Sequence, residues 1–335
     1  MNVLVTLKPE HYEVSHHAFG VLAEIDWTQK RVIRTLRIPS ASFRCGEAFM
    51  GPLTGGVCHI GKRVFVAFWN FILEVDYDRF EIVNAVSSPW MADLHGIATD
   101  GHYLWVTSTA IEALLCLSAE SLETLWRWGP DEKILAYGIP STWMRWLGRL
   151  RKQRVPPSPQ ARFQEKNEYR HLHKGRSMWH RHHLNDVTWY EGKLYLDTKG
   201  WFDGGSSSVI CLDPESRQAD FFVQPGGFKG MHDGEFVGGR FYVTESEGNS
   251  VAWREPDGTI CSRSVQPAPR FIRGLCYTGQ SFLIGSTRLR RTHDSTEIIE
   301  YDMNFENILG QMDLGFFYPM EQGAAIHALA RSPGG

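Results

Sequence analysis

The stretch HLNDVTWYEGKLYLDT, residues 183–198, decides the fold. It begins with polar residues and continues as two β-prone, alternating runs on either side of the dipeptide Glu191-Gly192. Alternation of apolar and polar residues around a two-residue turn is typical of a β-hairpin. The stretch therefore predicts two antiparallel strands, and the first of them starts with the polar group His183-Leu184-Asn185-Asp186.

The same unit occurs in four more complete copies and in one truncated copy. The complete copies span 54–67, 94–107, 231–244 and 272–285, and the truncated copy starts at 326. Successive copies lie about 40 residues apart, except for one interval of about 90 residues. Forty residues is the length of one four-stranded blade of a β-propeller. The repeat therefore predicts a propeller whose innermost strands begin with the polar group.

Both ends of the chain contribute strand-like runs that have no complete blade of their own. These runs are 3–6, 18–26, 31–38 and 324–330. We expect them to form one shared blade, because closure by both termini hides the edges of the sheet. The predicted architecture is a single all-β domain over residues 1–335, a six-bladed β-propeller, with seven blades if an insertion at 129–182 contains strands.

Composition narrows the class of protein. At 335 residues the chain is long enough for a large β domain, and its formal charge of −3 gives no reason to expect nucleic acid as a partner. It has no apolar run long enough to span a membrane, and its first residues do not resemble a signal peptide. None of its six cysteines forms a Cys-x-x-Cys pair, so we expect a reduced, cytoplasmic protein.

The insertion at 129–182 differs from the rest of the chain, with twelve Lys and Arg against four Asp and Glu. Within it, residues 140–154 have apolar side chains at helical spacing. The insertion connects an outermost strand to the next innermost strand, which places it over the channel mouth where the inner strands begin. Three interpretations remain open: a solvated surface segment, a lid or collar that attracts anions, and a helix that docks on a membrane surface or a protein partner.

Aligning the copies places polar residues in one column at the start of the inner strands. The column contains Gly55, His95, Asn185, His232, Arg273 and His327. Because inner strands line the central channel of a propeller, these positions should form a ring. Imidazoles from three blades are suitable ligands for Zn, Fe, Cu or Ni, with His183 and Asn185 as further candidate ligands. The oxygen atoms of Asn185 and its neighbour would also suit Ca or Mg, which we expect less.

Four residues beside this ring are candidates for catalysis. Asp186 and Asp233 are candidate general bases, and Glu235 is a weaker one. Arg273 would hold an anionic group of a small substrate through its guanidinium fork. The leading hypothesis is therefore a hydrolase or lyase in which a divalent metal acts as a Lewis acid or activates water.

Two other hypotheses account for the same residues. In the first, the propeller binds a peptide or small ligand without catalysis. In the second, it is a docking module that acts through residues 140–154. The polar column also has a purely structural interpretation, in which each side chain bonds the backbone of a neighbouring blade and Arg273 pairs with Asp233 or Asp186.

With the repeat established, the chain resembles the broad superfamily of six-bladed propellers that includes NHL-repeat proteins, strictosidine-synthase-like proteins and regucalcin/gluconolactonase lactonases. The resemblance is one of architecture and covers nearly all of the chain outside 129–182. The pair Asn185-Asp186, followed by a turn and Leu194-Tyr195-Leu196, is similar to the Asn-Asp element with which the lactonases hold a divalent cation. The resemblance thus implies a cation near Asn185.

Overall fold

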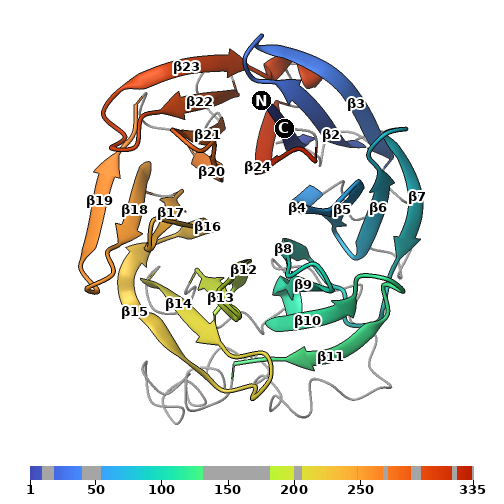
Figure 1. Ribbon diagram of the computed structural model, residues 1–335, viewed down its shortest axis with the longest axis vertical. Helices are drawn as coiled ribbons and strands as arrows, with labels where there is room; N and C mark the ends of the chain where they lie inside the picture. The colour runs from blue at the N-terminus through green and yellow to red at the C-terminus, as the bar shows by residue number, and fades with distance from the viewer. Residues whose placement is uncertain are drawn as a thin grey trace, which may run out of the picture.

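The computed structural model describes residues 1–9, 19–39, 54–130, 182–199, 206–246, 248–266, 271–287, 296–318 and 323–333. Over these residues the chain is all-β and folds into six four-stranded antiparallel sheets arranged around a central axis (Figure 1). This arrangement confirms the predicted six-bladed propeller.

Each blade runs from an inner strand at the axis to an outer strand at the rim (Figure 1). Blade 1 contains β24 (Ala324–Arg331), β1 (Asn2–Pro9), β2 (Phe19–Asp26) and β3 (Arg31–Pro39). Blade 2 contains β4 (Thr54–Ile60), β5 (Arg63–Phe68), β6 (Phe71–Asp76) and β7 (Glu81–Val86). Blade 3 contains β8 (Leu94–Thr99), β9 (Tyr103–Ser108), the short 3-10 helix η2 (Thr109–Ile111), β10 (Ala113–Ser118) and β11 (Thr124–Trp128).

The second half of the ring repeats this order. Blade 4 contains β12 (Leu184–Tyr190), β13 (Lys193–Thr198), β14 (Ser206–Leu212) and β15 (Ala219–Lys229). Blade 5 contains β16 (Met231–Val237), β17 (Arg240–Glu245), β18 (Ser250–Arg254) and β19 (Ile260–Ser264). Blade 6 contains β20 (Phe271–Tyr277), β21 (Phe282–Thr287), β22 (Glu297–Tyr301) and β23 (Ile308–Asp313), and the 3-10 helix η3 (Gly315–Phe317) follows it.

Blade 1 closes the ring with both ends of the chain. Strand β1 pairs with β2 on one side and with β24 on the other, with Val5 opposite Leu329. The predicted pairing of 3–6 with 324–330 is thereby confirmed. Both termini lie beside each other in this blade (Figure 1).

The insertion begins and ends where the sequence predicts, after β11 of blade 3 and before β12 of blade 4. Residues 131–181, including the predicted helix at 140–154, lie outside the described residues. The lid and docking interpretations therefore stay predictions. Within the described chain, no helix is long and apolar enough to cross a membrane. The five cysteines in that part of the chain, Cys58, Cys116, Cys211, Cys261 and Cys276, are free thiols.

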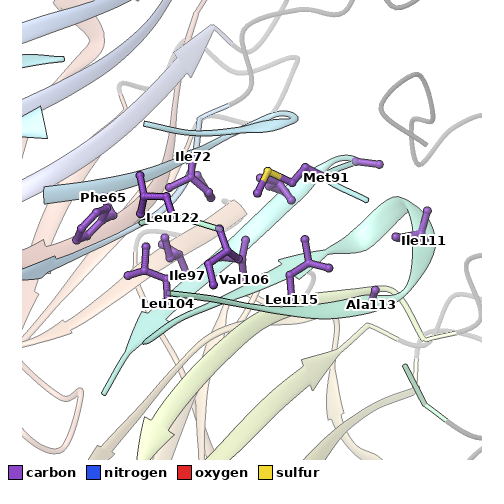
Figure 2. Packing of buried hydrophobic residues seen from close by; sticks show 14 of the residues in the cluster. Phe65, Ile72, Met91, Ile97, Leu104, Val106, Ile111, Ala113, Leu115 and Leu122 are labelled. Atoms are coloured by element: carbon purple, nitrogen blue, oxygen red, sulfur yellow. The ribbon is translucent and has the colours of Figure 1, made fainter. Parts of the chain in front are cut away.

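Apolar side chains fill the spaces between neighbouring blades. In Figure 2, Phe65 and Ile72 of blade 2 lie against Leu104, Val106 and Leu115 of blade 3, and all five are buried. Full burial of such a side chain contributes about 1.5–3 kcal/mol to folding. Because each cluster is shared by two blades, a blade cannot bury its own apolar face without its neighbours.

Polar side chains connect the blades nearer the axis. The Thr6 hydroxyl on β1 donates a hydrogen bond to the Gly55 carbonyl of blade 2 at 2.8 Å. The same hydroxyl accepts from the Ala328 N–H of β24 at 3.1 Å. One buried hydroxyl thus joins two strands of blade 1 to blade 2 at the point where the ring closes.

We predict that Thr6→Val lowers the free energy of unfolding by about 1–3 kcal/mol, because it removes the partner of two buried backbone groups. Chemical denaturation followed by tryptophan fluorescence measures this change. The exposed Thr35 on β3 supplies the control: Thr35→Val should stay within about 0.5 kcal/mol of the parent protein. Equal stability of the two variants would contradict the role given to Thr6.

Candidate functional site

Each of the six inner strands carries a bulge at the aligned column. In β12, Leu184 pairs with Thr198 and Asp186 with Asp197, so Asn185 has no partner across the hairpin. The same extra residue occurs between Thr54 and Val57, Leu94 and Ile97, His232 and Gly234, Arg273 and Leu275, and Ile326 and Ala328. A bulge redirects the side chains around it and often lies next to a functional site. Here the bulges lie in one layer around the channel.

The backbone at these bulges adopts conformations that strands rarely use. Asp233, the extra residue of β16, has φ 54°, and Gly274, the extra residue of β20, has φ 77°. His183 and Asp93, two residues before the column in blades 4 and 3, have φ 51° and 53°. Asp and Gly tolerate the left-handed region better than most residues. The local sequence is therefore compatible with the bend that directs these side chains inward.

Four predicted residues form the inner end of one cavity. His95, Asn185, His232 and His327 are each 3–7% exposed, and all four line a cavity of about 370 Å³. We call them the histidine layer. Their convergence from four blades agrees with the ring expected from the alignment.

The cavity extends from the histidine layer toward the ends of the inner strands. Its walls include Asp186, Asp233 and Glu235, and farther along it is lined by Trp189 and Arg331. No residue that precedes the column in an inner strand lines it. The sequence argument placed the mouth at the other end, where the inner strands begin and the insertion joins the chain.

His232 has both ring nitrogens in hydrogen bonds. Its Nδ1 lies 2.7 Å from the Ser246 hydroxyl and 3.2 Å from the Gly230 carbonyl. The Ser246 hydroxyl donates to the Ile272 carbonyl at 2.6 Å, so Nδ1 carries the proton and donates to Ser246. Nε2 is then the acceptor for Arg273 Nη2. Burial, and next the Arg273 charge, hold the pKa of His232 well below its ordinary value.

Arg273 lies behind the histidine layer and does not line the cavity. Burial lowers its pKa to about 10, although the nearby carboxyls of Asp233, Asp93 and Asp186 favour its charged form. The contact of Arg273 with His232 is a partner that the sequence did not suggest, and pairing with Asp233 or Asp186 stays a prediction. Its predicted role in holding a substrate anion stays a prediction, and would require the side chain to turn away from His232.

Each of the three carboxyls that line the cavity accepts a backbone N–H from the next blade. The pairs are Asp186 Oδ2 with Gly234 N at 3.2 Å, Asp233 Oδ2 with Gly274 N at 2.7 Å, and Glu235 Oε2 with Tyr277 N at 2.7 Å. These bonds fix the carboxyls in place and join blades 4, 5 and 6.

Burial is the main cause of altered acidity in all three groups. It raises the pKa of Asp186 to about 7, with the neighbouring Asp233 carboxyl as the next cause. It raises the pKa of Asp233 to about 6 and that of Glu235 to about 7. Carboxyls with pKa values near neutrality in a cavity are typical of functional sites.

Asp197 on β13 is a buried acid that the sequence argument missed. It lies opposite Asp186, at the position that Thr107 and Thr244 occupy in blades 3 and 5. Those hydroxyls donate to inner-strand carbonyls at 3.4 and 2.9 Å. Asp197 is 0% exposed, and neither carboxyl oxygen has a hydrogen-bond partner among the described residues. Burial, followed by the Asp186 and Asp233 charges, raises its pKa well above the ordinary value.

Asn185 presents a second unsatisfied acceptor. Its side-chain Nδ2 donates to the Met231 carbonyl of blade 5 at 2.8 Å. Its Oδ1 is buried and has no hydrogen-bond partner in the described part of the chain. The amide therefore connects two blades with its nitrogen, while its oxygen stays buried.

His95 is the centre of a group of imidazoles. Its ring centre lies 5.4 Å from that of His327 and 5.6 Å from that of His183, and both pairs are edge to face. Its Nε2 is 3.4 Å from Asp93 Oδ1, a buried carboxylate that the alignment did not select. Among the described residues, no group of three or more His, Cys, Asp or Glu is arranged to hold a metal ion. The divalent-metal site stays a prediction.

Glu112 is another buried acid beside the site. It lies in blade 3 and accepts the backbone N–H groups of His182 and His183, the latter at 3.3 Å. It thereby fixes the chain just before β12. Only its place between two strand-like runs, with apolar neighbours on both sides, distinguishes it in the sequence.

Comparison with solved structures supports the fold alone. A chain in the crystal structure of a nidogen/laminin complex aligns with a TM-score of 0.60 at 8% identity, over 98% of this chain and 98% of that chain. A protein of unknown function from Bacteroides caccae also aligns with a TM-score of 0.60, at 10% identity over 98% and 97% of the two chains. No protein-family model and no curated protein matches the sequence. Propellers with so little identity share architecture and not necessarily chemistry.

We predict that Asp197→Thr stabilises the protein by about 1–3 kcal/mol at pH 8, because it replaces an unsatisfied buried acid by the residue type of blades 3 and 5. The pKa of Asp197 is raised in the folded state, so its contribution to stability is present below the ordinary pKa and is lost as pH rises through the folded value. The advantage of the variant should therefore be larger at pH 8 than at pH 5.

Chemical denaturation at the two pH values tests this expectation. Asp220→Thr, at an exposed position of β15 in the same blade, is the matched control and should show little change. A destabilised Asp197→Thr protein at both pH values would show that the acid has an essential structural partner.

Proposed function

We propose that the axial cavity binds a small polar molecule. The observation that carries this proposal is the meeting of the histidine layer and three fixed carboxyls in one cavity of about 370 Å³. Ligand pockets have volumes of about 300–1,000 Å³ and contain a few convergent polar groups. The ligand-binding alternative from the sequence is thus the function that the geometry supports best.

The walls of the cavity combine polar and aromatic surface. Asn185 lines the inner end, and the carboxyls come from the neighbouring strands β12 and β16. Trp189 lines the cavity farther out and stacks on the buried Trp105 ring, with 6.0 Å between ring centres. A ligand with an apolar part toward Trp189 and polar groups toward Asn185 matches this distribution.

The same walls supply groups for proton transfer. The pKa values of Asp186 and Glu235 are raised to about 7, so both groups gain or lose a proton near neutral pH. General acid–base catalysis works best with such values. The cavity therefore supports binding of a ligand. The same carboxyls could also carry out acid–base chemistry on the bound ligand.

We predict that a panel of small anions, neutral polyols and amines contains molecules that raise the melting temperature. Free ligand at about 100 times its Kd stabilises a protein by about 2.7 kcal/mol. Binding should also change the emission of Trp189, which lines the cavity.

The location of binding is tested with two tryptophan variants. The ligand-induced change in fluorescence should disappear in Trp189→Phe and persist in Trp253→Phe, which replaces a ring on β18 that does not line the cavity. A panel in which no class shifts the melting temperature would contradict the proposed function.

A second candidate is the divalent-metal hydrolase or lyase. The imidazoles of His95, His183 and His327 favour it, with ring centres 5.4 and 5.6 Å apart around His95. Two imidazoles on one tetrahedral zinc ion, each at 2.0–2.1 Å, have ring centres roughly 5 Å apart. The two pairs of ring centres around His95 are close to this spacing. Asp186 or Asp233 would act as the base in this candidate.

We predict for this candidate that protein purified without a His tag retains about one zinc ion per chain after incubation and dialysis. His95→Ala should lose that zinc, because His95 is common to both imidazole pairs. The exposed His102 in the β8–β9 turn provides the control, since His102→Ala should retain the metal. Elemental analysis that finds equal metal in the parent protein and His95→Ala would exclude this site.

A further inference from the structure

The charged side chains that line the cavity are mostly acidic. Three carboxyls line it, Asp186 from β12 and Asp233 and Glu235 from β16. Arg331 is the one Lys or Arg among its lining residues in the described chain. It is exposed, and its Nε donates to the Tyr277 carbonyl at 2.7 Å. The described lining therefore carries three carboxyls against one Lys or Arg side chain.

The nearest buried cation is turned away from this space. Arg273 contacts His232 Nε2 from behind the histidine layer and is not a lining residue. His232 itself donates from Nδ1 to Ser246, and its Nε2 has only a lone pair to offer. His95 and His327 complete the inner layer from blades 3 and 1. Among the described residues, the charge of Arg331 acts on Glu235, and the charge of Arg273, which does not line the cavity, acts on Asp186 and Asp233.

The carboxyls are held in position before any ligand arrives. One oxygen of each accepts a backbone N–H of the next blade. Asp186 and Asp233 come from neighbouring inner strands, β12 and β16, and each lies one residue past the histidine layer. Fixed groups lose little conformational entropy on binding, and this increases affinity.

Unsatisfied acceptors lie at the same place. Asn185 Oδ1 is buried without a hydrogen-bond partner among the described residues, and Asn185 itself lines the cavity. Both oxygens of Asp197 are also buried without such a partner, directly across the hairpin from Asp186. A buried acceptor without a donor costs about 1–3 kcal/mol. The site is thus short of donors, and an ammonium group supplies three.

We propose that the cavity binds a small organic cation, with a primary ammonium group between Asp186 and Asp233. The carbon part of the ligand extends toward Trp189, whose ring offers apolar contact. This inference rests on the proposed ligand-binding function and specifies its substrate class. It reverses the sign of the small anionic substrate that Arg273 suggested in the sequence.

Three probes with one carbon skeleton test the sign of the ligand. Isothermal titration calorimetry compares 1-aminohexane, 1-hexanol and hexanoate at neutral pH. We expect the amine to bind at least about tenfold more tightly than the other two, since only it pairs with the carboxyls. Trimethylhexylammonium, which retains the charge but has no N–H donor, should bind more weakly than the primary amine.

Isosteric variants test the position of the ammonium group. Asp233→Asn and Asp186→Asn keep an amide oxygen for the Gly274 and Gly234 N–H groups, so both should fold. Each should weaken binding of 1-aminohexane by about 10–100-fold, through loss of a charged partner. The matched control is Asp220→Asn, an exposed position that should leave the affinity unchanged.

The outcomes separate this inference from the proposed function. Equal or tighter binding of hexanol or hexanoate would overturn the cation assignment while supporting a ligand-binding cavity. Failure of all three probes, or tight binding of Ca²⁺ that excludes the amine, would also overturn it. Absence of any ligand in the wider panel of anions, polyols and amines would overturn the proposed function as well.

Discussion

Hydrogen bonds from side chains of one blade to the backbone of the next are the constraint on which the structure depends. Thr6 contacts Gly55, Asn185 contacts Met231, and Asp233 contacts the Gly274 N–H. Apolar packing between blades is strong but non-directional, so it does not by itself set how far one blade slides along the axis relative to the next. These directional bonds set that position. The hydrogen bonds thereby hold the six bulges in one layer. This common layer brings the side chains of the histidine layer together at one end of the cavity.

The carboxyls show how structural and functional roles share one side chain. A buried, ionised carboxyl is costly unless hydrogen bonds or opposite charge compensate it. One backbone N–H for each carboxyl offsets part of that cost, and the remainder appears as pKa values of about 6 and 7. The three carboxyls are therefore fixed in position, while their protonation state changes near neutral pH. A positively charged ligand would offset the part of the desolvation cost that the backbone N–H groups do not offset.

The propeller fold and the ring of polar residues at its axis were predictable, because both depend on the 40-residue sequence repeat. Recurrence of one hairpin with two-residue turns specifies blades, and alignment of His95, Asn185, His232 and His327 places them in one layer. Alternation does not encode bulges, so the direction in which the cavity extends was missed. Nor does it encode rotamers, so the contact of Arg273 with His232 Nε2 could not be predicted. Asp197 was missed because the alignment followed the first strand of each hairpin and not the second.

Blade 2 shows that a blade can take part in the closed ring without polar side chains at these positions. At the positions of Asn185, Asp186 and Asp197 it has Gly55, Gly56 and Ala67, and there the strands approach closely. A Cβ added at Gly55 would lie 2.6 Å from the His95 carbonyl oxygen, so at this position the backbone of blade 2 lies directly against the backbone of blade 3. The ring therefore closes without acids at these positions. Blades 4 and 5 have three carboxyls and an amide there. Asn185, Asp186 and Asp233 bond the backbone of the next blade, whereas Asp197 has no hydrogen-bond partner among the described residues and costs desolvation that the fold does not require. Residues that break the local rule of a repeat, without stabilising the fold, are expected where function is located.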